Sequence, residues 1–244
     1  MLTKKNDPSM KQTIPFFRSP LWVLSHIALI AALLLWFNPL THPFLQHLDE
    51  TVFQIFNGNL VDKPFWQVFW GLLNDRRETK LNLLFAALIN LWVILATQDK
   101  ALRYQRIKKI IYFWICFQIG FMIQEGIFNN WLHIARDSPS LVLKPAVKLS
   151  QVLQNFNLKE GTQHSFPSGH AFSLIYWASF TLFCAPRRIG MIALFIAILL
   201  CLPRLFIGAH WLSDEVFSVL MALVWLSWTV NNPIYHKINS KVRF

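Results

Sequence analysis

The chain has 244 residues, a formal net charge of +11, 55% hydrophobic residues and only 14% charged residues. Soluble domains average about 25% charged residues, and a chain with 22 Phe and 11 Trp cannot cover a water-facing surface. The composition predicts an integral membrane protein and excludes intrinsic disorder and small disulfide scaffolds. Basic residues are dispersed around apolar blocks, so we expect no nucleic-acid partner. Cys116, Cys184 and Cys201 lie in apolar stretches, where we expect them to pack without disulfides.

A transmembrane helix needs about 20 mainly apolar residues, and fewer where flanking side chains reach the headgroups. Six stretches qualify to different degrees: 21–37, 81–97, 110–128, 171–185, 189–202 and 215–230. Two further apolar stretches, 48–56 and 65–73, are typical of interfacial or re-entrant helices. We therefore predict an all-α integral membrane fold, with six transmembrane helices and interfacial helices in the first outer loop. We expect residues 1–244 to form one domain.

Loop charges predict the orientation, because cytoplasmic loops carry an excess of Lys and Arg. With the N-terminus inside, the inner segments hold 14 basic and two acidic residues, and the outer segments hold nine basic and ten acidic residues. We expect cytoplasmic tails at 1–20 and 231–244, with the first tail leading into an uncleaved anchor. The segments 38–80 and 129–167 then face the other compartment.

Three polar clusters fall on this outer face. They are Arg136-Asp137-Ser138-Pro139, then Ser165-Phe166-Pro167-Ser168-Gly169-His170, then Arg204 with His210 and Asp214. The clusters are distant in sequence, yet the predicted topology brings all three to one membrane surface. Any one of them has an ordinary structural explanation. Their joint occurrence on one face predicts a functional site.

The second cluster has the features of an anion site. Pro167 can start a helix, and Ser168 and Gly169 then expose backbone N–H groups at its first turn. His170 would stand beside these donors, where an imidazole can transfer a proton near neutral pH. The second cluster therefore predicts a phosphate-binding helix start with an adjacent acid or base.

The third cluster has the features of an activated nucleophile. His210 and Asp214 are four residues apart and would share one face of a helix. A carboxylate there can fix the imidazole tautomer and leave the other nitrogen free to attack. Arg136 and Arg204 offer permanently charged, forked donors that suit phosphate oxygens. The clusters together indicate phosphoryl chemistry.

These residues resemble the second and third motifs of the type 2 phosphatidic acid phosphatase (PAP2) superfamily, with Pro-Ser-Gly-His at 167–170 followed by Arg204-x5-His210-x3-Asp214. The spacing of the third motif matches in full, and the matching region covers roughly half the chain. The resemblance implies a helical membrane core and a metal-independent lipid phosphatase or phosphotransferase. It also implies that this enzyme acts through a phosphohistidine and needs no cofactor.

Carried over by position, the resemblance assigns a role to each polar residue. It makes His210 the nucleophile, Asp214 its orienting partner, and His170 the acid that protonates the leaving group. The groups that hold the phosphoryl oxygens would be Arg136, Arg204, Ser168 and Gly169. The expected substrate is a phosphorylated membrane lipid.

Two positions depart from the family pattern. The family's first motif has a Lys seven residues before an Arg-Pro pair; here that position is Asn129, and Arg136 is followed by Asp137, with the proline at Pro139. The family also has a Ser before the third-motif Arg, where this chain has Pro203. One phosphate contact is therefore missing or supplied elsewhere. The candidates are Arg76, Arg77, Lys144 and Lys148, of which we single out the two arginines.

Arg-x-Ser-Pro at 136–139 and the Asn-x-Arg segment at 74–76 give a narrower resemblance, to the branch that makes lipid A 1-diphosphate. Members of that branch move a phosphate from undecaprenyl diphosphate to lipid A. Alternatives are a plain isoprenyl-diphosphate or phosphatidylglycerophosphate-type phosphatase, and, more remotely, a non-catalytic transporter of anionic lipids. No metal site is expected from ligand spacing. We assign no role to Glu125, His133 or His164.

Overall fold

The computed structural model describes residues 20–75 and 77–240, and this part of the chain is helical with two isolated β-bridges. Arg76, most of the predicted N-terminal tail and the last four residues of the C-terminal tail lie outside the described residues. None of the three cysteines forms a disulfide.

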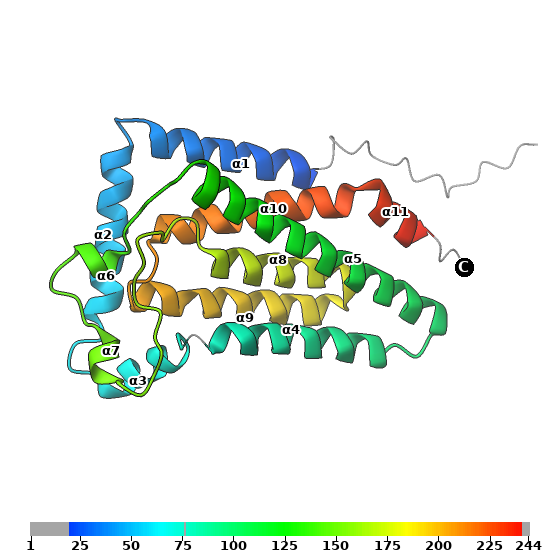
Figure 1. Ribbon diagram of the computed structural model, residues 1–244. Coiled ribbons are helices and arrows are strands. Elements are labelled where there is room, and N and C mark those ends of the chain that lie inside the picture. Colours follow the sequence, from blue (N-terminus) through cyan, green and yellow to red (C-terminus); the bar gives the residue numbers. More distant parts are fainter. Residues whose placement is uncertain (1–19, 76, 241–244) are drawn as a thin grey trace, which may run out of the picture.

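Each predicted apolar stretch forms a helix. Long helices lie side by side as a bundle: α1 (Pro20–Phe37), α4 (Glu78–Leu95), α5 (Lys100–Glu125), α8 (Gly169–Cys184), α9 (Arg187–Phe206) and α10 (Leu212–Asn231) (Figure 1). One end of the bundle carries α2 (His42–Gly58), α3 (Pro64–Leu72), α6 (Pro139–Val142) and α7 (Leu149–Val152) (Figure 1). A π-helical segment, Gly126–Trp131, extends α5, and α11 (Pro233–Ser240) follows α10.

Four helices in the described residues are long and apolar enough to cross a membrane: Pro20–Phe37, Lys100–Phe128, Arg187–Phe206 and Leu212–Asn231. A shorter apolar stretch, Lys80–Leu95, lies in α4. Helix α8 has 16 residues, which is about 24 Å at the usual helical rise and less than the roughly 30 Å of a hydrocarbon core. The all-helical membrane fold is confirmed, whereas six crossings stay a prediction.

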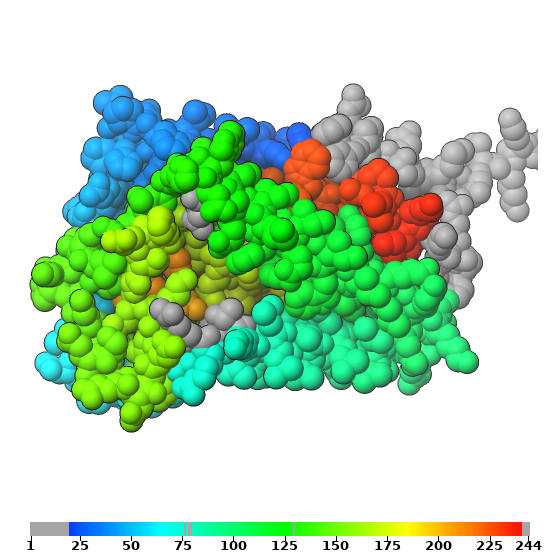
Figure 2. Space-filling view, viewed as in Figure 1, coloured from blue at the N-terminus to red at the C-terminus, as the bar shows by residue number. Residues whose placement is uncertain are grey.

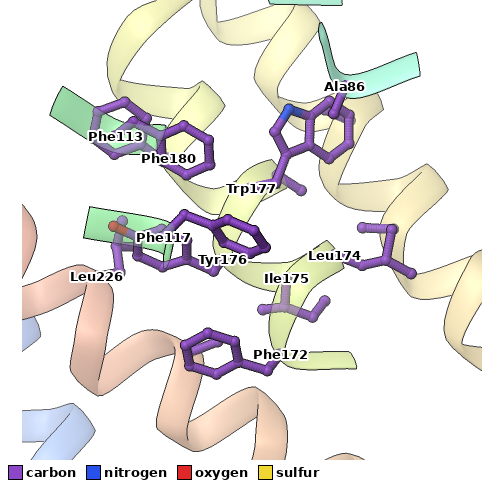
Figure 3. Close-up of a cluster of buried hydrophobic side chains, with 14 of the residues drawn as sticks. Ala86, Phe113, Phe117, Phe172, Leu174, Ile175, Tyr176, Trp177, Phe180 and Leu226 are labelled. Atoms are coloured by element: carbon purple, nitrogen blue, oxygen red, sulfur yellow. The ribbon is translucent and has the colours of Figure 1, made fainter. Parts of the chain in front are cut away.

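Helix α8 lies at the centre and packs against α5, α9 and α10. Its side chains are buried on nearly all sides, as expected for a helix that is apolar all round. The rings of Phe113 and Phe180 stack on each other, and Tyr176 stacks on Phe113 (Figure 3). The hydroxyl groups of Tyr176 and Thr229 are 2.8 Å apart and join α8 to α10. This rigid centre fixes the start of α8, which belongs to the predicted site.

Backbone hydrogen bonds join the three polar clusters at the end of the bundle that carries α2. The Ser165 N–H donates to the Arg136 carbonyl at 2.8 Å, which links the first cluster to the second. The Ser140 N–H donates to the Gly208 carbonyl at 3.1 Å, which links the segment after the first cluster to the third. The clusters therefore meet at one end of the molecule, as the sequence predicts.

Candidate active site

His210 lies in the loop between α9 and α10 and is 3% exposed. Its Nδ1 is 2.7 Å from the Ser165 carbonyl oxygen. Because a carbonyl can only accept, Nδ1 carries the proton in the neutral ring, and Nε2 keeps its lone pair. Nε2 is buried and has no hydrogen-bond partner among the described residues. Such a nitrogen is suited to attack an electrophile that enters the site.

Asp214 supports His210 from the first turn of α10. Its Oδ2 is 3.7 Å from His210 Nδ1 and accepts a hydrogen bond from the Trp211 N–H at 2.9 Å. The two residues do not share a helical face, which corrects our expectation, because Trp211 is the N-cap and α10 begins after His210. The carboxylate therefore acts on the imidazole by charge and by fixing the loop.

Arg136 lies behind His210 and makes several hydrogen bonds. Its guanidinium donates to Asp214 Oδ1, to Asp49 Oδ2 at 2.7 Å and to the Ser213 hydroxyl at 2.8 Å. Its planar group also lies over the Trp36 ring, 4.5 Å from the centroid. The 2%-exposed Asp49 additionally accepts from the Ser213 N–H and hydroxyl. The Arg136 guanidinium thus donates to two carboxylates and one hydroxyl group.

Arg204 occupies the last turn of α9 and is 2% exposed. Its Nη1 donates to the Asn74 side-chain oxygen, and the Asn74 amide donates to the Pro203 carbonyl at 3.2 Å. The Arg204 carbonyl accepts from the N–H groups of Ala209, at 2.9 Å, and His210, at 3.3 Å. Arg204 therefore carries a cation and also anchors the loop that holds His210.

Ser168 is the N-cap of α8 and accepts a hydrogen bond from the Ala171 N–H at 3.2 Å. The Ser168 hydroxyl donates its hydrogen bond to Glu215 Oε1 at 2.9 Å. This hydroxyl is therefore not available to donate to a bound phosphate in this state. A Cβ at Gly169 would lie 3.2 Å from the Phe121 ring, which favours glycine there. His170 Nε2 is 3.0 Å from the Leu200 carbonyl, so Nδ1 carries no proton in its neutral ring.

A cavity of about 360 Å³ lies between α4, α5 and α8, and His210 lines it together with His170, Gly169 and Arg204. Three residues that the sequence analysis left without this role also line it: Lys159, His164 and Glu125. The rest of the lining includes apolar side chains of α4, α5 and α8, such as Leu83, Phe117, Phe121 and Trp177. In Figure 2 a hollow opens between α5 and the yellow-green segment before α8.

The remaining predicted residues lie elsewhere. Arg136, Asp214 and Ser168 do not line the cavity but lie behind it, in the contacts described above. Arg77 lines a second, larger cavity of about 820 Å³ between α4 and α9 and pairs with Asp75 at 2.7 Å. Its hydrogen bonds hold the pKa of Asp75 below its ordinary range. Lys144 and Lys148 are exposed and line neither cavity.

Sequence reasoning missed four residues of this site: Asp49, Asn74, Lys159 and Glu215. Asn74 belongs to the Asn-x-Arg segment that was noted for its resemblance, but its contact with Arg204 joins positions 130 residues apart. The other three carry no local pattern that separates them from solvated charges. Within the described residues, no three His, Cys, Asp or Glu side chains form a group that could hold a metal ion.

Comparison with known proteins agrees with this geometry. Residues 114–237 match the model of the PAP2 superfamily. The chain is 26% identical over 220 residues to lipid A 1-diphosphate synthase of Escherichia coli (strain K12), and the match covers 90% of each protein. The fold is similar to that of a transmembrane PAP2 type phosphatidylglycerolphosphate phosphatase from Bacillus subtilis, with a TM-score of 0.51 and 15% identity. That likeness covers 91% of this chain and 96% of the other. The family match spans half of the chain, and this multi-pass membrane protein therefore belongs to the PAP2 superfamily.

Proposed function

We propose that the protein transfers a phosphoryl group from a lipid diphosphate through a covalent intermediate on His210. The observation that carries the proposal is the buried Nε2 of His210, which has no partner among the described residues and lines a cavity shared with Arg204. The Nε2 lone pair attacks phosphorus, a P–N bond forms, and the P–O bond to the leaving group breaks. Protonated His170 gives its proton to the leaving oxygen. An acceptor oxygen then attacks the phosphohistidine, returns a proton to His170 and restores His210.

Positioning and charge stabilisation are the main demands of phosphoryl transfer. Arg204 supplies a buried cation, and the first backbone N–H groups of α8, at Gly169 and His170, supply donors at a helix N-terminus. Ser168 fixes that terminus through Glu215. Arg136 positions Asp214 and hence His210, in place of the direct phosphate contact expected from the sequence. No step in this scheme requires a metal ion, so we expect activity to survive chelation.

The donor in this proposal is undecaprenyl diphosphate, and the acceptor is lipid A 1-phosphate. Similarity to the E. coli lipid A 1-diphosphate synthase supports the acceptor. Apolar side chains of α4 and α5 line the cavity beside the catalytic groups, where a lipid chain can lie. The excess of basic residues in the predicted inner segments supports cytoplasmic termini and a site on the periplasmic side of the inner membrane.

The test uses purified protein in detergent micelles with undecaprenyl diphosphate, with and without lipid A 1-phosphate, followed by phosphate assay and mass spectrometry. Phosphate appearing on lipid A with little release means transfer. Release without an acceptor means a plain phosphatase for isoprenyl diphosphates. His210→Ala is expected to abolish both reactions. His164→Ala, which removes another imidazole from the same cavity, is the matched control. Turnover by His210→Ala at the wild-type rate would refute the mechanism, and chelator-sensitive activity would refute metal independence.

A further inference from the structure

Among the described residues that line the cavity, Lys159 is a cation that the proposed mechanism does not use. It lies in the segment between α7 and α8 and is half-buried. It lines the same cavity as Arg204, His170 and His210. A lysine held at this place is chemically suited to phosphoryl oxygens, because an ammonium group offers three donors and a compact positive charge.

Lys159 is joined by a backbone hydrogen bond to Asn74, the residue whose side chain also bonds Arg204. Leu158 forms an antiparallel bridge with Asp75, and the Lys159 N–H donates to the Asn74 carbonyl at 3.4 Å. Asn74 is fully buried, and its side chain accepts from Arg204 while it donates to the Pro203 carbonyl. Asn74 therefore joins three chain segments, and two of them bring a cation to the cavity.

The charges around the two arginines indicate why a second cation is needed. Asp49 and Asp214 neutralise Arg136 behind the cavity. Arg204, by contrast, lines the cavity. A phosphoryl group in transfer spreads negative charge over three oxygens, so one cation leaves part of that charge unmatched.

We propose that Lys159 binds the phosphoryl group together with Arg204, and that Asn74 is a positioning residue that sets the distance between these two cations. This inference rests on the proposed function, because it concerns the phosphate that His210 attacks. It assigns the missing first-motif contact to Lys159, a residue outside the candidates drawn from the sequence.

The first experiment compares Lys159→Gln with Lys148→Gln, a change of an exposed lysine before α7 that lines neither cavity. Lys159→Gln is expected to lower kcat/KM by about 100-fold, the size of losing one donor to a transition-state oxyanion. It should raise the inhibition constants of inorganic phosphate and vanadate by about tenfold. Lys159→Arg, which keeps the charge, should recover most of this loss. Lys148→Gln should stay within about twofold of wild type. Equal behaviour of the two glutamine variants would overturn the proposal.

Glu125 lines the same cavity, so Lys159 has a competing role as the group that neutralises this carboxylate. Glu125→Gln separates the two roles. If Lys159 binds phosphate, the inhibition constant of phosphate for Glu125→Gln should be equal to or lower than that of the wild type. If Lys159 only neutralises Glu125, the Lys159→Gln and Glu125→Gln variants lose stability alike and phosphate inhibition is unchanged in both. The second pattern would overturn the proposal.

Asn57 provides the matched control for Asn74. Both asparagines are buried and join distant segments: Asn57 bonds the backbone of Val147 and Phe206, whereas Asn74 bonds Arg204 and Pro203. Asn74→Ala and Asn57→Ala should lower the melting temperature alike, but only Asn74→Ala should also weaken vanadate inhibition, by about tenfold. Equal vanadate inhibition in the two variants would overturn the positioning role.

An inactive His210→Ala beside a fully active Lys159→Gln would refute this inference alone, whereas an active His210→Ala would refute the proposed function.

Discussion

Asp49→Ala tests how the site is braced, because this carboxylate joins α2 to Arg136 and to the start of α10. The change removes the carboxylate that accepts hydrogen bonds from Arg136 Nη2 and from the N–H and hydroxyl of Ser213. Removing one partner of a buried ion pair costs about 3–5 kcal/mol. The Arg136 side chain is 18% exposed, so water recovers part of this. We therefore expect a loss near the lower limit, about 3 kcal/mol or roughly 100-fold in the unfolding equilibrium.

The assay is unfolding in mixed micelles, with Glu50→Ala as the matched control. Glu50 is the next residue on α2, and its hydrogen bond from Gln46 is exposed, so its loss should stay below about 0.5 kcal/mol. Activity gives a second readout. Loosened Arg136 disturbs Asp214, so kcat should fall by about tenfold with KM unchanged. Equal unfolding of the two variants would refute the bracing role, and a raised KM at constant kcat would show that Arg136 holds phosphate.

Two further predictions concern the turns near the site. Gly208 has a φ of +71°, and a Cβ there would lie 2.4 Å from the Phe53 ring, so Gly208→Ala should cost about 2–3 kcal/mol in a thermal unfolding assay. Gly58→Ala, where a Cβ meets nothing within 4 Å, should cost nothing, and equal melting temperatures would contradict the reasoning. Arg77→Ala should return the pKa of Asp75 toward its ordinary value. Since a lowered folded-state pKa stabilises only above the unfolded value, the small destabilisation should be present at pH 7 and shrink below about pH 4. An equal loss at pH 7 and pH 3 would contradict this assignment.

The sequence predicted every major helix because apolar runs of this length have few other solutions in a bilayer. It placed the ends less well. Helix α5 begins at Lys100, ten residues before the predicted span, because Asp99 caps it and its first turns are charged. The position of the three polar clusters at one end of the molecule also followed from the predicted topology. Segments that are separated by an even number of membrane crossings lie at the same membrane surface.

The support of the site was beyond sequence reasoning because it depends on contacts between distant segments. Asp49 and Ser213 are 164 residues apart, and Asn74 and Arg204 are 130 apart. Periodicity and spacing carry information over a few helical turns. A buried carboxylate in an amphipathic helix therefore looks the same as a solvated one until the partner is placed.

Arg136 and Arg204 show most clearly what a sequence leaves open. Both are arginines beside family motifs on one membrane face, and by residue type they are equally suited to phosphate. Their positions separate them: Arg136 pairs with Asp49 and Asp214 behind the cavity, whereas Arg204 lines the cavity. An incoming dianion therefore meets the charge of Arg204 and, in our proposal, of Lys159. Asp49→Asn removes a negative charge beside Arg136 and is expected to lower kcat, because Arg136 supports His210 through Asp214. Asn74→Asp adds a negative charge beside Arg204 and is expected to raise KM, because Arg204 binds the phosphate in our proposal.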